Sequence, residues 1–271
     1  MFDFEWVQPK QECSEVVDLR YNQCNQDEYL AVAVIKDASA DLSPDGEQYA
    51  FYNLNLSDYE LNLLAQIHIM DFNVLATVSF VQDFPEKISS FLGSVLECGD
   101  NLLVPTQVSL IALKLISNII AASNYSDATV NFIAYNNGDS SYYPCWHIDK
   151  THAEELREPF LGNQNVYIVT LKGPSTLYHK MDHDIRLKFN LLANESRHSY
   201  GYDKFVHYVK NEGIYALLSN SNSESAAFGK GAVHLAGRWS GTVHSTPEGA
   251  ERLVLIVTPG DKDAIERLHH T

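Results

Sequence analysis

The first half of the chain carries apolar residues at helical spacing. From about residue 57 to residue 122 this pattern predicts mostly helices, and Ser57 is well placed to cap the first of them. Pro85 suits the first turn of a second helix that runs through Cys98. Thr106 is placed to cap a third helix. The pattern therefore predicts a helical N-terminal region.

After residue 124 the pattern changes to short runs rich in β-branched and aromatic residues, which are separated by turn-forming Gly, Pro and Asn. These runs predict strands at residues 129–135, 165–171, 176–178, 213–218, 232–235 and 252–257. Short strands with such turns are typical of sandwiches and barrels. Helices followed by strands indicate an α+β fold with a mainly β core. We expect a double-stranded β-helix (a jelly roll, cupin-like) with the N-terminal helices packed on one sheet.

This division predicts one integrated domain with two parts. Residues 1–124 are expected to form an N-terminal helical region packed on the core, and residues 125–271 to form the jelly-roll core. Residues 180–212 are polar and rich in His, Tyr, Asn and Lys, so we interpret them as an insertion between strands. Loops of this length are often lids or substrate-binding elements, so closure of this insertion over a substrate is a hypothesis that the sequence leaves open.

The amino-acid composition and net charge argue against some classes of protein. The chain has 271 residues, of which 45% are hydrophobic, so it can bury a substantial core. A net charge of -16 and a pI of about 5.0 oppose attraction to nucleic acids or to an anionic membrane. The longest apolar stretch, residues 108–122, is interrupted by Lys114 and Asn118. This stretch therefore predicts a buried helix and not a membrane span.

The cysteines and the N-terminal residues indicate the cellular compartment in which we expect the protein. The four cysteines lie far apart without a C-x-x-C pair, so neither a zinc ribbon nor a disulfide framework is indicated. The first five residues are partly acidic and do not begin a long apolar core of the kind found in secretory signals. We expect a soluble, cytoplasmic protein with free thiols, and its oligomeric state stays open.

Trp146-His147-Ile148-Asp149 is the most informative stretch for chemistry. Side chains two apart on a strand point to the same face, so His147 and Asp149 could hold one metal ion together. His244 is available as a third ligand. Two imidazoles and one carboxylate are the ligand set of non-haem Fe(II) oxygenases, which leave positions open for substrates and oxygen. Because the chain has 11 histidines, ordinary polar roles for these residues remain the alternative.

The order of these residues resembles the core of the 2-oxoglutarate/Fe(II) dioxygenase superfamily. The matching features are, in chain order, Tyr135, a Gly-containing turn, His147, Asp149, His244 and Arg252. The resemblance covers roughly the second half of the chain. Residues 173–176 and 243–247 are in addition similar to an uncharacterised bacterial branch of that superfamily.

The resemblance implies a set of cofactors and their ligands. Fe(II) would be held by His147, Asp149 and His244, and the cosubstrate 2-oxoglutarate would chelate it. Arg252, eight residues after His244, would pair its planar guanidinium with the distal carboxylate of 2-oxoglutarate. A surface arginine paired with a nearby acidic residue is the alternative for Arg252.

Several neighbouring residues are candidates for supporting roles. Tyr135 and Tyr167 could each donate a hydroxyl hydrogen bond to the cosubstrate, although core packing explains them equally well in a chain with 15 tyrosines. Trp146 faces away from the ligands on an ideal strand, which predicts a packing role. His152 and His234 are expected to line or support the pocket.

The resemblance implies an oxygenase that couples oxidative decarboxylation of 2-oxoglutarate by O2 to oxidation of an unidentified small-molecule or protein substrate. Hydroxylation is the expected outcome, with demethylation or desaturation as variants. Two alternatives stay open: a non-catalytic jelly-roll binding protein, and a cupin metalloenzyme that does not use 2-oxoglutarate. The acidic balance and the missing basic groove argue against a nucleic-acid substrate.

Overall fold

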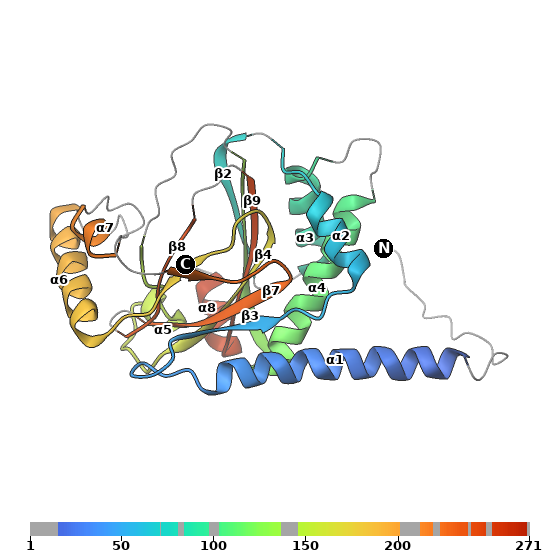
Figure 1. Cartoon of the computed structure of the whole chain (residues 1–271), viewed down its shortest axis with the longest axis horizontal. Helices are drawn as coiled ribbons and strands as arrows, with labels where there is room; N and C mark the ends of the chain where they lie inside the picture. The colour runs from blue at the N-terminus through green and yellow to red at the C-terminus, as the bar shows by residue number, and fades with distance from the viewer. Residues whose placement is uncertain are drawn as a thin grey trace.

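The computed structural model describes residues 16–70, 72–80, 84–97, 103–136, 146–200, 212–218, 223–237, 240–247 and 251–269. Antiparallel sheets and helices together form an α+β fold (Figure 1). Asn137, Gly138 and Cys98, which belong to the predicted turn and the predicted second helix, lie outside the described residues.

A large antiparallel sheet forms the centre of the fold, with the strand order β1-β7-β4-β9-β3-β2. Its strands are β1 (Tyr49–Asn53), β2 (Phe72–Phe80), β3 (Asp127–Asn136), β4 (Gln164–Lys172), β7 (Lys230–Ala236) and β9 (Glu251–Gly260). The register of β3 and β9 places Tyr135 directly opposite Arg252.

A small antiparallel sheet has the order β6-β5-β8 and contains β5 (Leu177–His179), β6 (Ser223–Ser225) and β8 (Val243–Ser245). Beyond β8, His147 and His244 form an antiparallel bridge with two backbone hydrogen bonds of 2.9 and 3.0 Å. The segment of His147 therefore extends the edge of the small sheet. From β4 onward the chain passes from the large sheet to β5 and β6 of the small sheet, returns to β7, crosses to β8 and returns to β9.

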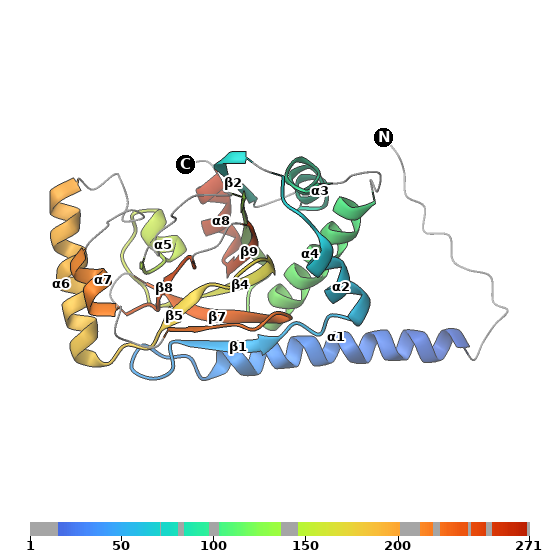
Figure 2. The same cartoon turned by 45° about the horizontal axis from the view of Figure 1, so that its top comes forward.

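Helices cover one face of the large sheet (Figure 2). They are α1 (Val16–Ala40), α2 (Asp58–Gln66), α3 (Phe84–Val95) and α4 (Val104–Ala122). Alternate strand residues such as Phe132, Val169 and Leu255 join these helices in the main hydrophobic core. The opposite face of the same strands carries Val166 and Val254 in a smaller apolar cluster.

The predicted helices of the N-terminal region are present, with small shifts. Ser57 caps α2 through a capping box, in which its hydroxyl accepts from the Glu60 amide and the Glu60 carboxylate accepts from the Ser57 amide. Pro85 lies in the first turn of α3, which ends at Val95. The third helix, α4, begins at Val104, ahead of the predicted cap at Thr106, because Pro105 is well suited to a first helical turn.

The N-terminal region also contributes two strands, which differs from the prediction of a helical region. β1 and β2 form the two edges of the large sheet. β2 has the sequence FNVLATVSF, and its β-branched and aromatic residues favour a strand that pairs with β3. Pairing with strands that are distant in sequence therefore determines the structure of β1 and β2, which the prediction had placed in the helical region.

α4 is the apolar helix predicted from residues 108–122. By length and composition alone it could cross a membrane, and half of its most apolar window is buried inside the fold. Val108, Leu115 and Ile119 are among its buried residues and lie in the main core. The prediction of a buried helix is confirmed by this packing.

Five of the six strands predicted after residue 124 are confirmed by β3, β4, β5, β7 and β9. The prediction of a strand at residues 213–218 is wrong, because these residues form the helix α7 (Glu212–Leu218). Ile214 and Leu218 lie one helical turn apart, and both are buried. Their spacing suits packing against a helix better than alternation on a strand.

The described part of the predicted insertion is helical. α6 (His183–Tyr200) and α7 pack on the side of the small sheet away from the large one, at the left of Figure 1. Phe189 of α6 belongs to one apolar cluster with Val243, Trp146 and Ile148. Trp146 thus packs as expected. The remainder of the insertion, residues 201–211, lies outside the described residues, so the hypothesis of a lid stays a prediction.

Candidate metal centre

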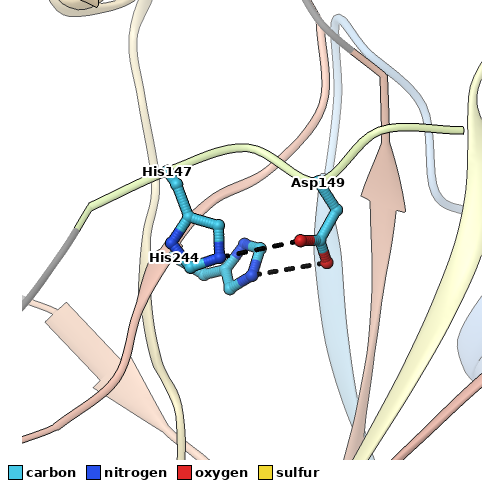
Figure 3. Close-up of side chains that lie close together, drawn as sticks. All are labelled: His147, Asp149 and His244. Atoms are coloured by element: carbon cyan, nitrogen blue, oxygen red, sulfur yellow. Dashed lines mark ion pairs between the residues drawn. The ribbon is translucent and has the colours of Figure 1, made fainter. Parts of the chain in front are cut away.

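The structure brings together the three residues predicted to bind a metal ion. His147 and Asp149 lie on the segment between β3 and β4, and His244 lies on β8. One potential ligand atom from each lies within 4.8 Å of the others (Figure 3). Two neutral imidazoles and a carboxylate suit Fe(II) and similar first-row metals. The donor set therefore fits the predicted metal.

Distances within this triad show that its polar atoms converge. His147 Nε2 lies 3.6 Å from Asp149 Oδ1, and His244 Nε2 lies 3.4 Å from Asp149 Oδ2. The Nδ1–H of His244 donates to the carbonyl oxygen of Thr242 at 3.2 Å, which leaves the Nε2 lone pair facing Asp149. Imidazole nitrogens and a carboxylate that converge in this way are stabilised by a cation among them, and a hydrogen bond from Nδ1 is the usual support of a metal-binding histidine.

Burial and charge favour the protonation states that metal binding requires. Burial alone would raise the pKa of Asp149, but attraction from His244, His234 and His147 holds it well below its usual range. Burial lowers the pKa of His244 to about 4, against the opposing attraction of Asp149. At neutral pH Asp149 is therefore ionised and His244 is neutral, and both are in their ligating forms.

Arg252 is buried, with only 3% of its surface exposed. Its Nε donates to the carbonyl oxygen of Pro174 at 3.0 Å, and its Nη2 donates to Thr176 Oγ1 at 2.7 Å. Among the described residues no carboxylate lies within ion-pair distance of it, and burial lowers its pKa. A buried guanidinium without a counterion carries an uncompensated positive charge, so it is suited to bind an anionic ligand.

Gly173 allows the backbone that holds Arg252. Its φ is +82°, and a Cβ placed there would lie 2.0 Å from the carbonyl oxygen of Glu251. Only glycine fits so close to β9 in this conformation. The close passage brings Pro174 and Thr176 to the guanidinium, which gives the Gly173-Pro174-Ser175-Thr176 motif a structural role.

Tyr135 lies beside Arg252, the other β-sheet residue for which a cosubstrate contact was predicted. Its ring is buried on the same face of the large sheet as Arg252, and its hydroxyl interacts with that guanidinium. Burial raises the pKa of Tyr135, so it carries a proton at neutral pH. A protonated phenol beside the guanidinium can donate to a ligand carboxylate.

Tyr167 does not lie where the sequence predicted. It is on the opposite face of the large sheet, in the main core beneath the helices, and its ring centroid is 6.3 Å from that of Tyr52. Side chains alternate along a strand, so Val166 and Ile168 face the site and Tyr167 faces away. The prediction of a cosubstrate contact for Tyr167 is therefore wrong, and Tyr167 packs in the core, as the alternative stated.

Sequence reasoning missed Tyr178, which lies between the triad and Arg252. It pairs directly with His244 across β5 and β8, and the two rings stack with centroids 6.0 Å apart. Electrostatic interactions link it both to Asp149 and to Arg252, while burial raises its pKa well above the ordinary value. Alternation in the predicted strand at residues 176–178 would have placed Tyr178 on the same face as Thr176.

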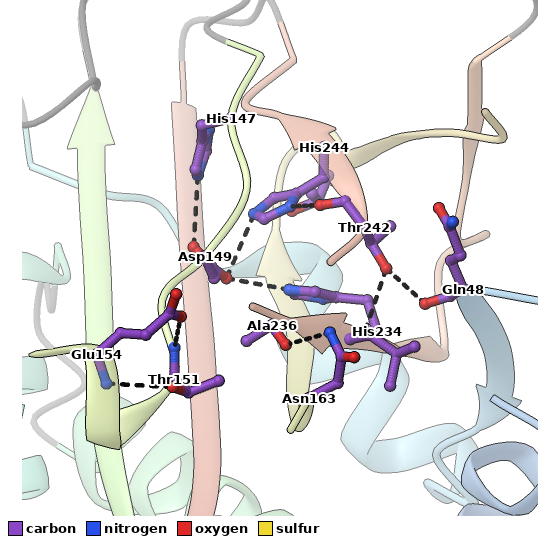
Figure 4. Close-up of polar contacts among 12 residues, drawn as sticks. Gln48, His147, Asp149, Thr151, Glu154, Asn163, His234, Ala236, Thr242 and His244 are labelled. Atoms are coloured by element: carbon purple, nitrogen blue, oxygen red, sulfur yellow. Dashed lines mark hydrogen bonds and ion pairs between the residues drawn. The ribbon is translucent and has the colours of Figure 1, made fainter. Parts of the chain in front are cut away.

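His234 and His152 both support the centre, but from different places. His234 on β7 is fully buried, and its Nε2 is 3.0 Å from Asp149 Oδ2 (Figure 4). His152 lies three residues after Asp149 and contacts Thr129 Oγ1 at 3.1 Å and the side chain of Gln164 at 3.0 Å. It thus fixes the chain just after Asp149.

Comparisons with known proteins give distant structural likenesses. No protein-family model matches the sequence, and a search of curated proteins gave no match. A prolyl hydroxylase from Trichoplax adhaerens, in complex with a peptide fragment of hypoxia inducible factor, is 10% identical with a TM-score of 0.43, and the match covers 90% of this chain and 95% of that chain. A prolyl-4-hydroxylase from Pseudomonas putida is 11% identical with a TM-score of 0.38, covering 84% of this chain and 98% of that one.

A third similar structure is a Kdo hydroxylase, a non-haem Fe(II) α-ketoglutarate-dependent dioxygenase in complex with cobalt(II). It is 12% identical with a TM-score of 0.39, and the match covers 91% of this chain and 88% of that chain. At such identities and TM-scores, the assignment of a function depends on this chain's own residues.

Proposed function

We propose that the protein is a 2-oxoglutarate- and Fe(II)-dependent oxygenase that hydroxylates an unidentified small-molecule or protein substrate. The observation that carries this proposal is the combination of the triad with a buried Arg252 that has no acidic partner among the described residues. A metal site alone would suit many reactions. A metal site with a nearby unpaired guanidinium suits a ligand that chelates at one end and carries a carboxylate at the other.

We infer that the β core is a double-stranded β-helix. The alternation of the chain between the two sheets supports this fold, as does the order of the small sheet with the segment of His147 at its edge. Side chains of the two sheets contact one another, since Tyr178 of β5 stacks on Tyr49 of β1 with centroids 5.1 Å apart. In such a fold the triad and Arg252 would lie between the sheets.

His147, Asp149 and His244 would hold the metal, and bound Fe(II) would supply the activation of O2 for substrate oxidation. Arg252 would bind the distal carboxylate of 2-oxoglutarate. Its Nε and one Nη are held by Pro174 and Thr176, so the guanidinium is oriented before the ligand arrives. Orientation in advance reduces the entropy lost on binding.

Tyr135 and Tyr178 would complete the cosubstrate pocket. Both are buried beside Arg252, and burial keeps both phenols protonated. They can donate hydrogen bonds to a carboxylate, which ionised groups in the same place could not do. Their rings also exclude water from the guanidinium, which strengthens its attraction for an anion.

Titration calorimetry with Mn(II) as a redox-inert metal tests this proposal. We expect 2-oxoglutarate to bind the Mn(II)-loaded protein, to bind far more weakly without metal, and to lose affinity in Arg252→Leu. His179→Leu is a matched control, because His179 is a buried histidine whose ring contacts Trp146 behind the site. Metal binding without 2-oxoglutarate binding would favour a cupin metalloenzyme of another chemistry, and the absence of metal binding would favour a non-catalytic binding protein.

A further inference from the structure

His234 contacts the metal-binding triad without being part of it. Its side chain is 0% exposed, and its Nε2 lies 3.0 Å from Asp149 Oδ2. Its ring centroid is 4.5 Å from that of His244. The potential ligand atoms that cluster within 4.8 Å belong to His147, Asp149 and His244. His234 therefore contacts the Asp149 carboxylate beside His244 (Figure 4).

The direction of this hydrogen bond follows from the partner. A carboxylate that binds a metal can only accept, so Nε2 of His234 must carry the hydrogen and donate it. The other ring nitrogen, Nδ1, is buried and has no hydrogen-bond partner among the described residues. Among the described residues, the hydrogen-bond partner of the His234 ring is therefore Asp149.

We propose that His234 is a positioning residue that holds Asp149 Oδ2 and so makes Asp149 bind the metal through Oδ1 alone. This inference rests on the proposed function. A carboxylate that binds through both oxygens would occupy one more position on the metal. With Oδ2 held by His234, three positions stay open, which a chelating 2-oxo acid and O2 together require.

The strand that carries His234 is well suited to this role. β7 lies between β1 and β4, so its backbone is hydrogen-bonded on both sides, with His234 opposite Tyr49 and Val166. At the end of the same strand, the amide of Gly237 donates to the backbone carbonyl of Asp149 at 2.9 Å. β7 and the residue after it therefore fix both the side chain and the backbone of Asp149.

The test compares substitutions that keep or remove the donor at the place of Nε2. His234→Gln can put an amide N–H near that place, whereas His234→Asn is too short and His234→Leu has no donor. The metal-free full chain is titrated with Co(II), and the visible absorption reports both affinity and coordination. Thermal unfolding of each metal-free variant reports whether it is folded, and His179→Leu is the control for loss of a buried histidine.

We expect His234→Leu and His234→Asn to bind Co(II) about 10- to 100-fold more weakly and with an altered spectrum, which is the usual loss when the support of a ligand is removed. We expect His234→Gln and His179→Leu to resemble the wild type. If His234→Leu does not fold, the comparison of His234→Gln with His234→Asn gives the same answer, because both are polar and differ mainly in reach.

Two results would overturn the positioning role while leaving the triad intact. In the first, folded His234→Asn or His234→Leu binds Co(II) with the affinity and spectrum of the wild type. In the second, His234→Gln loses as much affinity as His234→Asn, which would make His234 itself a ligand. Failure of the wild type to bind Co(II) would refute the proposed function as well, so the two failures are distinguishable.

Discussion

At the scale of single residues, the site is defined by polar groups that the fold buries without neutralising them. Arg252 contacts the carbonyl of Pro174 and the hydroxyls of Thr176 and Tyr135, and the described residues offer it no carboxylate. Burial of a charge without a counterion is costly, so such a residue is retained where a ligand completes it. The triad likewise places a carboxylate against imidazole lone pairs, an arrangement that a cation stabilises.

A substitution of Thr176 tests whether its hydroxyl orients the guanidinium of Arg252. Thr176→Val keeps the shape of the side chain but removes the acceptor for Nη2, which leaves a buried donor unsatisfied. We expect the free energy of unfolding, measured by chemical denaturation, to fall by about 1–3 kcal/mol. We also expect weaker binding of 2-oxoglutarate. Unchanged stability and unchanged binding would show that Thr176 does not orient the guanidinium.

Because His152 is buried, we predict that the free energy of unfolding depends on pH. Burial lowers its pKa to about 4 in the folded protein, below the ordinary value of 6.5. Between these values the unfolded chain binds a proton that the folded protein does not, so the free energy of unfolding falls as the pH drops from 6.5 toward 4. Above pH 6.5 this residue contributes no pH dependence. The full effect is on the order of 3 kcal/mol.

His152→Gln provides the comparison, because glutamine does not titrate. Denaturation at pH 7.5, 6.0 and 4.5 should show the gap in stability between wild type and variant shrinking as the pH falls. Asp149 and His244 titrate in both proteins, so their contributions cancel in this difference. A gap that is constant across the range would contradict the role of His152 in acid sensitivity.

At the scale of elements, the connection between β4 and β5 is the critical one for the site. Gly173→Ala would place a Cβ against the carbonyl oxygen of Glu251 at a φ of +82°. We expect a loss of more than about 1 kcal/mol in the free energy of unfolding, together with weaker 2-oxoglutarate binding. Gly93→Ala is a matched control, because Gly93 lies in α3 with open space around it. It should be stabilised by about 0.5–1 kcal/mol. Equal effects of the two substitutions would contradict this account.

α6 and α7 pack against the segment that carries His147 and Asp149. Phe189 is 3% exposed and packs in the cluster that includes Trp146 and Ile148. Phe189→Ala should lower the free energy of unfolding by about 3–5 kcal/mol, measured by chemical denaturation. Leu187→Ala on the same helix is the control, since Leu187 is 50% exposed. A small effect of Phe189→Ala would indicate that α6 detaches readily from the small sheet.

Elements differed in how far the sequence could predict them. β3, β4 and β9 were predictable because long β-branched runs mark buried strands, and α2 because a capping box is a local signal. The strand β2 and the helix α7 were not predicted, because each depends on packing against another element. Local propensity cannot show that β2 pairs with β3 or that α7 packs on α6.

At the scale of the whole molecule, the fold brings residues from distant segments into one site. The order of His147, Asp149, His244 and Arg252 could be read from the sequence, and the structure places these residues on β8, on β9 and on the segment between β3 and β4. The roles of Tyr178 and His234 could not be read, because register and face decide them. For the same reason Tyr167 was predicted on the wrong face of β4.

The most direct test of the proposed function is the visible spectrum of the metal-free protein after anaerobic addition of Fe(II) and 2-oxoglutarate. We predict a metal-to-ligand charge-transfer band in the wild type and in His179→Leu, no band in His147→Ala, and a weakened band in Arg252→Ala. The absence of a band in folded wild-type protein that has been exposed to both ligands would contradict the assignment of a 2-oxoglutarate- and Fe(II)-dependent oxygenase.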